Sequence, residues 1–136
     1  MFMKPKVSSA AKEIAALFHL NRQQSVVADR MFMSVDVDAG KELAWEGSST
    51  RQLVLILEGE VEVTKAGVRV AVLTAGDVLG EITALGIASE QSASATALVP
   101  CRVAVAGHSD LGHIKECAAL YLKLQSTASR RLVANA

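Results

Sequence analysis

The chain has 136 residues, the length of one domain, and its residues are half hydrophobic with few aromatics, which predicts a core of aliphatic side chains. Fourteen basic residues balance fourteen acidic ones, and a neutral chain lacks the positive field of a dedicated nucleic-acid binder. Autonomous DNA binding is therefore not expected.

The cysteines and the N-terminus bear on the cellular compartment. Cys101 and Cys117 are too few for a disulfide framework and are expected to be reduced and buried. The N-terminus MFMKPKVSS has no long apolar stretch, and no run approaches the ~18 apolar residues of a membrane span. These features predict a cytoplasmic protein without membrane contact.

Residues 1–30 are predicted to form a helical segment. Ser9 is the expected N-cap of a first helix in which apolar residues recur at helical spacing. A second short helix is expected over residues 22–30. His19, at the end of the first helix, is expected to be a capping or surface residue rather than a ligand.

Residues 31–108 show the pattern of short strands that end at glycines. Turn signals about every eight to twelve residues indicate an all-β sandwich or barrel. The segments EVEVT and VRVAVL predict a hairpin around Lys65-Ala66-Gly67, with Gly67 in the left-handed position. Trp45, in a short strand before Gly47, is expected to belong to the core rather than to stack on a base.

Residues 109–136 are predicted to form a C-terminal amphipathic helix that Ser109 or Asp110 caps. Its apolar stripe either packs on the domain's own core or forms a dimer seam, and it comprises Ile114, Cys117, Tyr121, Leu124 and Ala128. The chain as a whole is expected to be one domain, mainly β with flanking α-helices.

The loop over residues 76–94 has the features of an anion site. It contains Gly76-Asp77 and Gly80-Glu81, and no Lys or Arg. A turn that leads into a helix N-terminus presents unpaired backbone N–H groups and a partial positive charge. A glycine such as Gly80 lets the backbone come close to a ligand.

These residues resemble the cyclic nucleotide-binding domain family, which includes catabolite-activator-type regulators, regulatory subunits of cyclic-nucleotide-dependent kinases and gated channels. The resemblance extends from about Ala11 to Leu132. It rests on glycines at strand ends and on the G-D-x-x-G-E pattern that precedes Ile82-Thr83-Ala84-Leu85. It implies a double-stranded β-helix, also called a β-roll or jelly roll, with loop 76–94 as its phosphate-binding cassette.

The resemblance also implies ligand contacts. Glu81 would accept a hydrogen bond from a ribose hydroxyl, although it would equally stabilise a helix N-terminus. The residues expected to bind phosphate and ribose of cAMP or cGMP are Gly80, Glu81, Ile82, Thr83, Gln91, Ser92 and Ala93. The two serines of the tetrad Gln91-Ser92-Ala93-Ser94 could equally be outward-facing strand residues.

The tetrad departs from the family pattern because Gln91 occupies the position of the cassette arginine. Arginine offers phosphate a charged fork, whereas glutamine offers a neutral amide. The lost charge should cost about 1.5–3 kcal/mol or more, which lowers affinity about ten- to a hundredfold. Arg51 and Arg69 are the nearest alternative cations, and both are expected to be exposed strand-edge charges.

Two further classes of chemistry find no support in the residue pattern. A metal-binding β-roll needs clustered histidines, but His19, His108 and His113 form no H-x-H pair. A nucleophilic enzyme needs a base beside Ser, Thr or Cys, and no such arrangement is legible. Neither catalytic residues nor a metal or cofactor is expected.

The first functional hypothesis is a stand-alone cyclic nucleotide-binding-like sensor domain with weak or altered affinity. Ligand in the Gly80–Ser92 loop would reposition the helix after Asp110. The alternative is a degenerate domain that binds no cyclic nucleotide. It would act by protein contacts, through a homodimer on its C-terminal helix or through a separate effector protein. A helix-turn-helix reader would need more residues than follow the last predicted helix.

Overall fold

The computed structural model describes residues 8–80, 89–107, 109–110 and 120–126. The predicted site residues Glu81, Ile82 and Thr83 lie outside these ranges, as do Ile114, Cys117 and Ala128 of the predicted C-terminal stripe. The account below concerns the described residues.

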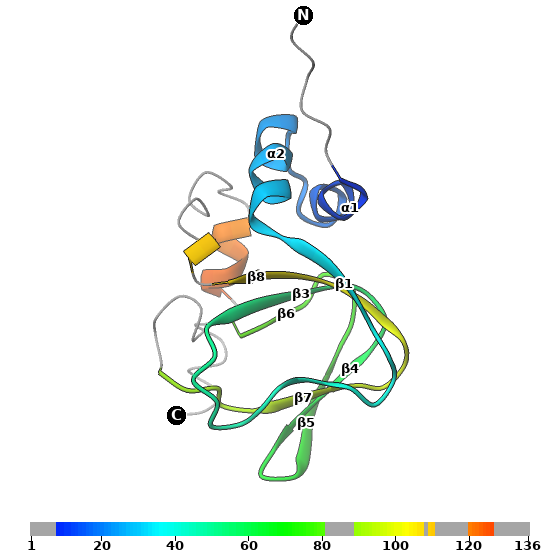
Figure 1. Ribbon diagram of the computed structural model, residues 1–136, viewed down its shortest axis with the longest axis vertical. Coiled ribbons are helices and arrows are strands. Elements are labelled where there is room, and N and C mark those ends of the chain that lie inside the picture. Colours follow the sequence, from blue (N-terminus) through cyan, green and yellow to red (C-terminus); the bar gives the residue numbers. More distant parts are fainter. Residues whose placement is uncertain (1–7, 81–88, 108, 111–119, 127–136) are drawn as a thin grey trace, which may run out of the picture.

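Two four-stranded antiparallel sheets form the β-roll, which confirms the predicted fold class (Figure 1). The upper sheet of Figure 1 has the order β1-β8-β3-β6 and the lower sheet the order β2-β7-β4-β5. The upper strands are β1 (Met33–Val37), β8 (Cys101–Gly107), β3 (Gln52–Glu58) and β6 (Val78–Leu79). The lower strands are β2 (Glu42–Ala44), β7 (Ser94–Ala97), β4 (Val61–Lys65) and β5 (Val68–Leu73).

Two helices cover the outer face of the upper sheet (Figure 1). Helix α1 spans Ser9–Phe18, and its N-cap is Ser8, whose Oγ accepts a hydrogen bond from the Ala11 N–H at 3.1 Å. The predicted cap, Ser9, was wrong by one residue because Ser9 already has helical geometry. Helix α2 spans Arg22–Met31 and begins with a capping box between Asn21 and Gln24.

His19 ends α1, as predicted, but through its backbone. Its φ of 57° places it in the left-handed region, and its N–H donates to the Ala15 carbonyl. The side chain is exposed. The backbone conformation of His19, rather than its side chain, therefore ends the helix.

The core has two parts because β3 is buried on both faces. One set of its side chains, with Val54 and Ile56, faces the interior of the roll. The other set, with Leu53 and Leu55, packs against α1 and α2. Burial on both faces explains why QLVLILE reads as an almost continuous apolar run rather than an alternation.

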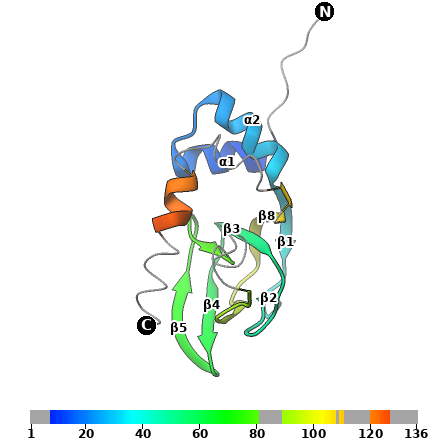
Figure 2. The same ribbon diagram turned by 90° about the vertical axis from the view of Figure 1, so that its left-hand side faces the viewer.

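The β4–β5 hairpin projects beyond the roll (Figure 2). Val61 faces inward and is buried, and Val63 is half-buried. Both turn residues are left-handed, Ala66 with φ 51° and Gly67 with φ 79°. The prediction gave this conformation to Gly67 alone, whereas two successive positive φ values match the hairpin turn whose twist fits paired strands.

Part of the C-terminal helix is described, over residues 120–126. Leu120 and Leu124 are fully buried in the core beneath α1 and α2, and Tyr121 packs against the same core. The described part of the predicted stripe thus packs on the domain itself. Asp110 accepts a hydrogen bond from the Gly107 N–H at 3.1 Å, so its carboxylate turns back toward β8.

Candidate functional site

A tight turn leads the chain into the candidate site. The Asp77 carboxylate accepts from the Thr74 N–H at 2.9 Å, and the Asp77 N–H donates to the Thr74 carbonyl at 3.0 Å. The Asp77 carbonyl in turn accepts from the Ile56 N–H at 2.9 Å. These bonds hold β6 against β3 and place Gly80 near the start of β3.

Gly80 can only be glycine at this point. Its φ is +76°, and an added Cβ would overlap the carbonyl oxygen of Gln52. The same Cβ would lie 3.5 Å from Nε2 of Gln91. The Gly80 backbone and the Gln91 amide are therefore neighbours, although 11 positions separate them in the printed sequence.

Hydrogen bonds from the main chain of Gln91 to neighbouring residues hold it in place. Its N–H donates to the Ser48 carbonyl at 2.7 Å, and its carbonyl accepts from the Gly47 N–H at 2.8 Å. Its Nε2 donates to the Thr50 carbonyl at 3.0 Å. This short bridge joins the segment before β7 to the turn between β2 and β3.

A pocket lies between these two segments, with about 330 Å³ of empty space, open solvent included. Its apolar lining comes from Leu43, Ala44, Trp45, Val54 and Leu79. Its remaining lining is polar or glycine, from Ser48, Thr50, Gln52, Gly80 and Gln91. None of these lining residues carries a charge.

The structure brings together two of the predicted site residues, Gly80 and Gln91, which lie beside each other in the lining of one pocket. Ser92 is exposed and Ala93 half-buried, and they lead into β7 without appearing among the lining residues described. Whether any of these residues binds a ligand stays a prediction.

Trp45 is the residue that sequence reasoning placed wrongly. It was expected in the core, but its side chain is 54% exposed and it lines the pocket. Strand β2 ends at Ala44, and Trp45 begins the following turn. The signal for this was Gly47, since a turn glycine two residues later shortens the strand that can bury a side chain.

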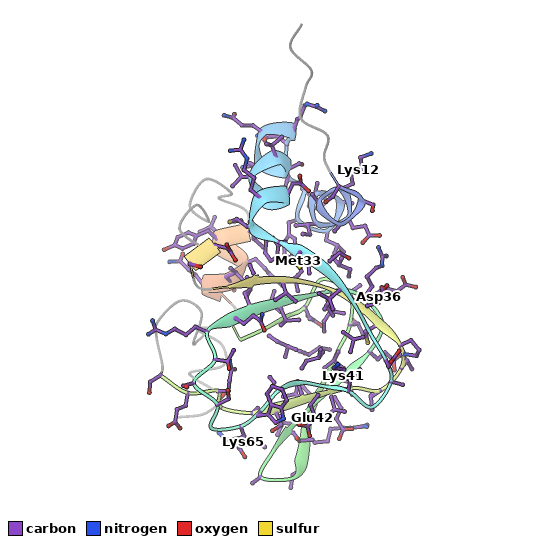
Figure 3. The ribbon with its side chains drawn as sticks, viewed as in Figure 1. Lys12, Met33, Asp36, Lys41, Glu42 and Lys65 are labelled. Atoms are coloured by element: carbon purple, nitrogen blue, oxygen red, sulfur yellow. The ribbon has the colours of Figure 1, made fainter. Side chains whose placement is uncertain are left out.

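The cations weighed as substitutes for the arginine lie elsewhere. Arg69 pairs with Glu62 at 3.3 Å on the lower sheet, and Arg51 is exposed; neither is among the pocket's described lining residues. Figure 3 places Lys12 on α1, Lys41 just before β2 and Lys65 at the end of β4, all exposed. The described lining thus offers a phosphate neutral donors rather than a positive charge.

In the described ranges, no group of three His, Cys, Asp or Glu side chains could hold a metal ion. Cys101 is buried and reduced, as predicted, and Cys117 lies outside the described residues. None of the described helices has the length and apolar character that crossing a membrane requires.

Comparison with known families gives one match, described as the cyclic nucleotide-binding domain, over residues 34–116. This range exceeds half of the chain and includes β2 to β8 with the pocket between them. No curated protein sequence matches the chain at a significant level.

Comparison with solved structures gives many similar folds. The Thermus thermophilus catabolite activator protein is 26% identical over 88% of this chain, with a TM-score of 0.74, and this chain spans 59% of its length. A putative cyclic nucleotide-binding protein from Geobacter metallireducens is 23% identical, with 95% and 98% of the two chains covered and a TM-score of 0.70.

A third similar structure is the regulatory domain of Toxoplasma gondii PKA, crystallised with cAMP. It is 19% identical over 81% of this chain and 46% of its own, with a TM-score of 0.69. At such identities, this structure and the Geobacter one show the fold alone.

Proposed function

The chain belongs to the cyclic nucleotide-binding domain family, a family of non-catalytic regulatory domains, and we propose that it is a sensor that binds cAMP or cGMP weakly. The phosphate would contact the Gly80 segment, and the expected contacts from Glu81, Ile82, Thr83, Ser92 and Ala93 are those of the family pattern. The match to the cyclic nucleotide-binding domain family supports cyclic nucleotides as the ligand class.

The position of Gln91 carries this proposal. Its amide lies beside Gly80 and lines the pocket, which is where a cassette arginine would have to lie to reach a phosphate there. A neutral amide whose Nε2 already donates to the Thr50 carbonyl is a poor substitute for a guanidinium. Weak affinity, lower by about ten- to a hundredfold, follows from the missing charge.

Isothermal titration calorimetry with cAMP and with cGMP tests the proposal directly. We expect saturable heats only at high micromolar to millimolar ligand. Saturation at low micromolar ligand would contradict the weak-binding proposal, and the absence of heat from both ligands at millimolar concentration would contradict the sensor function for these nucleotides.

A second candidate function is a protein-interaction or dimerisation module that binds no cyclic nucleotide. One observation favours it: Val68, Val70 and Val72 are exposed on β5, which is an edge strand of the lower sheet. Exposed apolar side chains on an edge strand are suited to pairing with another chain. This candidate predicts no heat in the titration above. Dimerisation and a cytoplasmic location remain predictions.

A further inference from the structure

We propose that Trp45 is the surface on which the planar base of the ligand stacks, so that this pocket recognises the nucleoside more than the phosphate. The inference rests on the proposed function, because it takes the pocket beside Gly80 and Gln91 as the nucleotide site. It goes further by naming the residue that carries affinity and the class of ligand that follows.

The exposure of Trp45 is the first observation. More than half of its side chain is open to solvent, although it lines a pocket whose neighbouring walls are apolar, such as Leu43 and Val54. An indole offers a large, rigid π-face, and every nucleobase offers a complementary one. An indole that is exposed at the rim of a pocket can cover a base from one side.

The rigidity of the turn that carries Trp45 is the second observation. The Trp45 carbonyl accepts from the Ser48 N–H at 3.1 Å, and the next residue, Glu46, donates its N–H to Ser94 Oγ at 2.9 Å. The Gly47 N–H donates to the Gln91 carbonyl. The backbone under Trp45 is therefore tied to both β7 and Gln91, and a preorganised platform loses little conformational entropy on binding.

The lack of charge among the described lining residues is the third observation. The described lining residues supply hydroxyl and amide groups from Ser48, Thr50, Gln52 and Gln91. Such groups can hydrogen-bond a sugar or a base edge, but they give no Coulombic preference for an anion. Stacking on Trp45 then supplies a larger share of the affinity than the phosphate does, and an uncharged purine nucleoside should bind about as well as its cyclic phosphate.

Trp45 provides its own readout because it is the one tryptophan in the printed sequence. Titration of the wild-type chain with cAMP, and separately with adenosine, should quench tryptophan fluorescence with the same midpoint that calorimetry gives. We expect the affinities for adenosine and cAMP to agree within about tenfold, which is one 1.4 kcal/mol step.

The variant Trp45→Ala should weaken both ligands by about five- to a hundredfold, the range that loss of one base–aromatic stack produces. Trp45→Phe keeps a π-face and should retain most of the affinity. Leu122→Ala is the matched control, since Leu122 is also exposed but lies outside the described pocket lining. Circular dichroism and thermal melts should show all three variants folded, because the altered side chains are largely in solvent.

The outcomes separate the inference from the proposed function. Calorimetric binding of cAMP that leaves tryptophan emission unchanged and survives Trp45→Ala would overturn the stacking inference alone, as would cAMP binding without adenosine binding. Adenosine binding through Trp45 without any cyclic nucleotide binding would support the stacking and overturn the proposed sensor function. No binding of any of these ligands would overturn both.

Discussion

At the scale of single residues, Gly80 and Gln91 constrain each other. Gly80 lies in the left-handed region, where an added Cβ would overlap the Gln52 carbonyl oxygen, and the Gln91 amide lies beside it. A larger residue at position 80 would displace either the start of β3 or the amide. The shape of the pocket therefore depends on a position without a side chain.

Gly80→Ala should lower the free energy of unfolding by about 2–4 kcal/mol. The left-handed backbone costs an alanine about 1–2 kcal/mol, and the overlap of its Cβ with the Gln52 backbone adds strain that no side-chain rotation can relieve. Chemical denaturation monitored by circular dichroism measures the change.

Gly40→Ala is the control for this substitution. Gly40 has a φ of +86°, but an added Cβ there would meet no atom within 4 Å, so only the backbone cost of about 1–2 kcal/mol applies. Equal losses for the two variants would show that the Gln52 carbonyl moves aside easily, against the tight fit described for Gly80.

Individual residues were also where sequence-based prediction failed most clearly. The glycines with their positive φ values were legible, since turn geometry needs them. The exposure of Trp45 was not legible, because a large apolar indole is expected to be buried. Only the position of Gly47 indicated that the strand had already ended. Likewise Ser8 and Ser9 are equally good caps in the sequence, and tertiary structure decides between them.

At the scale of elements, an ion-pair cluster fastens α1 to the upper sheet. Arg102 on β8 lies 2.6 Å from a Glu13 carboxylate oxygen on α1 and 3.2 Å from Glu58 on β3. Hydrogen bonds to Glu13 and then Glu58 raise the pKa of Arg102 despite some desolvation. A raised pKa in a basic group means that any stabilisation is lost only at strongly alkaline pH, so Arg102 keeps its charge throughout the neutral range.

The C-terminal helix makes its main described contact with the same core. Leu124→Ala should lower the free energy of unfolding by about 2–5 kcal/mol, because the leucine is fully buried and its removal leaves a cavity. Leu122→Ala, two positions away and 62% exposed, should change it by less than about 0.5 kcal/mol. Denaturation curves of the two variants give the comparison.

A small effect of Leu124→Ala, similar to that of Leu122→Ala, would contradict the packing of this helix on its own domain. It would instead favour the second role that the sequence left open for the apolar stripe, which is to form a dimer seam. The stripe itself was well predicted at Tyr121 and Leu124, since helical spacing brings them to one face. Leu120 was missed although it is fully buried.

Strand prediction shows the same division between pattern and context. The alternation in EVEVT was sufficient to place β4. Strand β6, with only Val78 and Leu79, falls within the loop predicted over residues 76–94. Two residues carry no periodicity, and they form a strand because β3 offers them a hydrogen-bonding edge.

At the scale of the whole molecule, one strand, β3, connects the pocket to the helices. Strand β3 begins beside the pocket at Gln52, and its outer face packs against the helical layer through Leu53 and Leu55. A ligand that shifts the start of β3 therefore has a packed route to α1 and to residues 120–126. Such a shift needs a ligand with different affinities for two arrangements of the helices.

The fold was predictable as a whole because strand-end glycines, hairpin signals and the G-D-x-x-G-E pattern all agree with one topology. The pairing of Gly80 with Gln91 was predictable only through the family resemblance, since neither residue has a local signal for the other. The contribution of the turn around Trp45 was not predictable, because it depends on the three-dimensional approach of β2 to the segment before β7.

The central claim is that the absent cassette charge limits affinity for cyclic nucleotide, and calorimetry of Gln91→Arg against the wild-type chain tests it most directly. An arginine there would set a guanidinium beside Gly80, and we predict that cAMP affinity rises at least tenfold, about 1.4 kcal/mol. The matched variant Gln91→Lys, which supplies charge without a bidentate fork, should gain less. An unchanged cAMP affinity in folded Gln91→Arg would contradict the claim, because it would show that another feature closes the pocket to the phosphate.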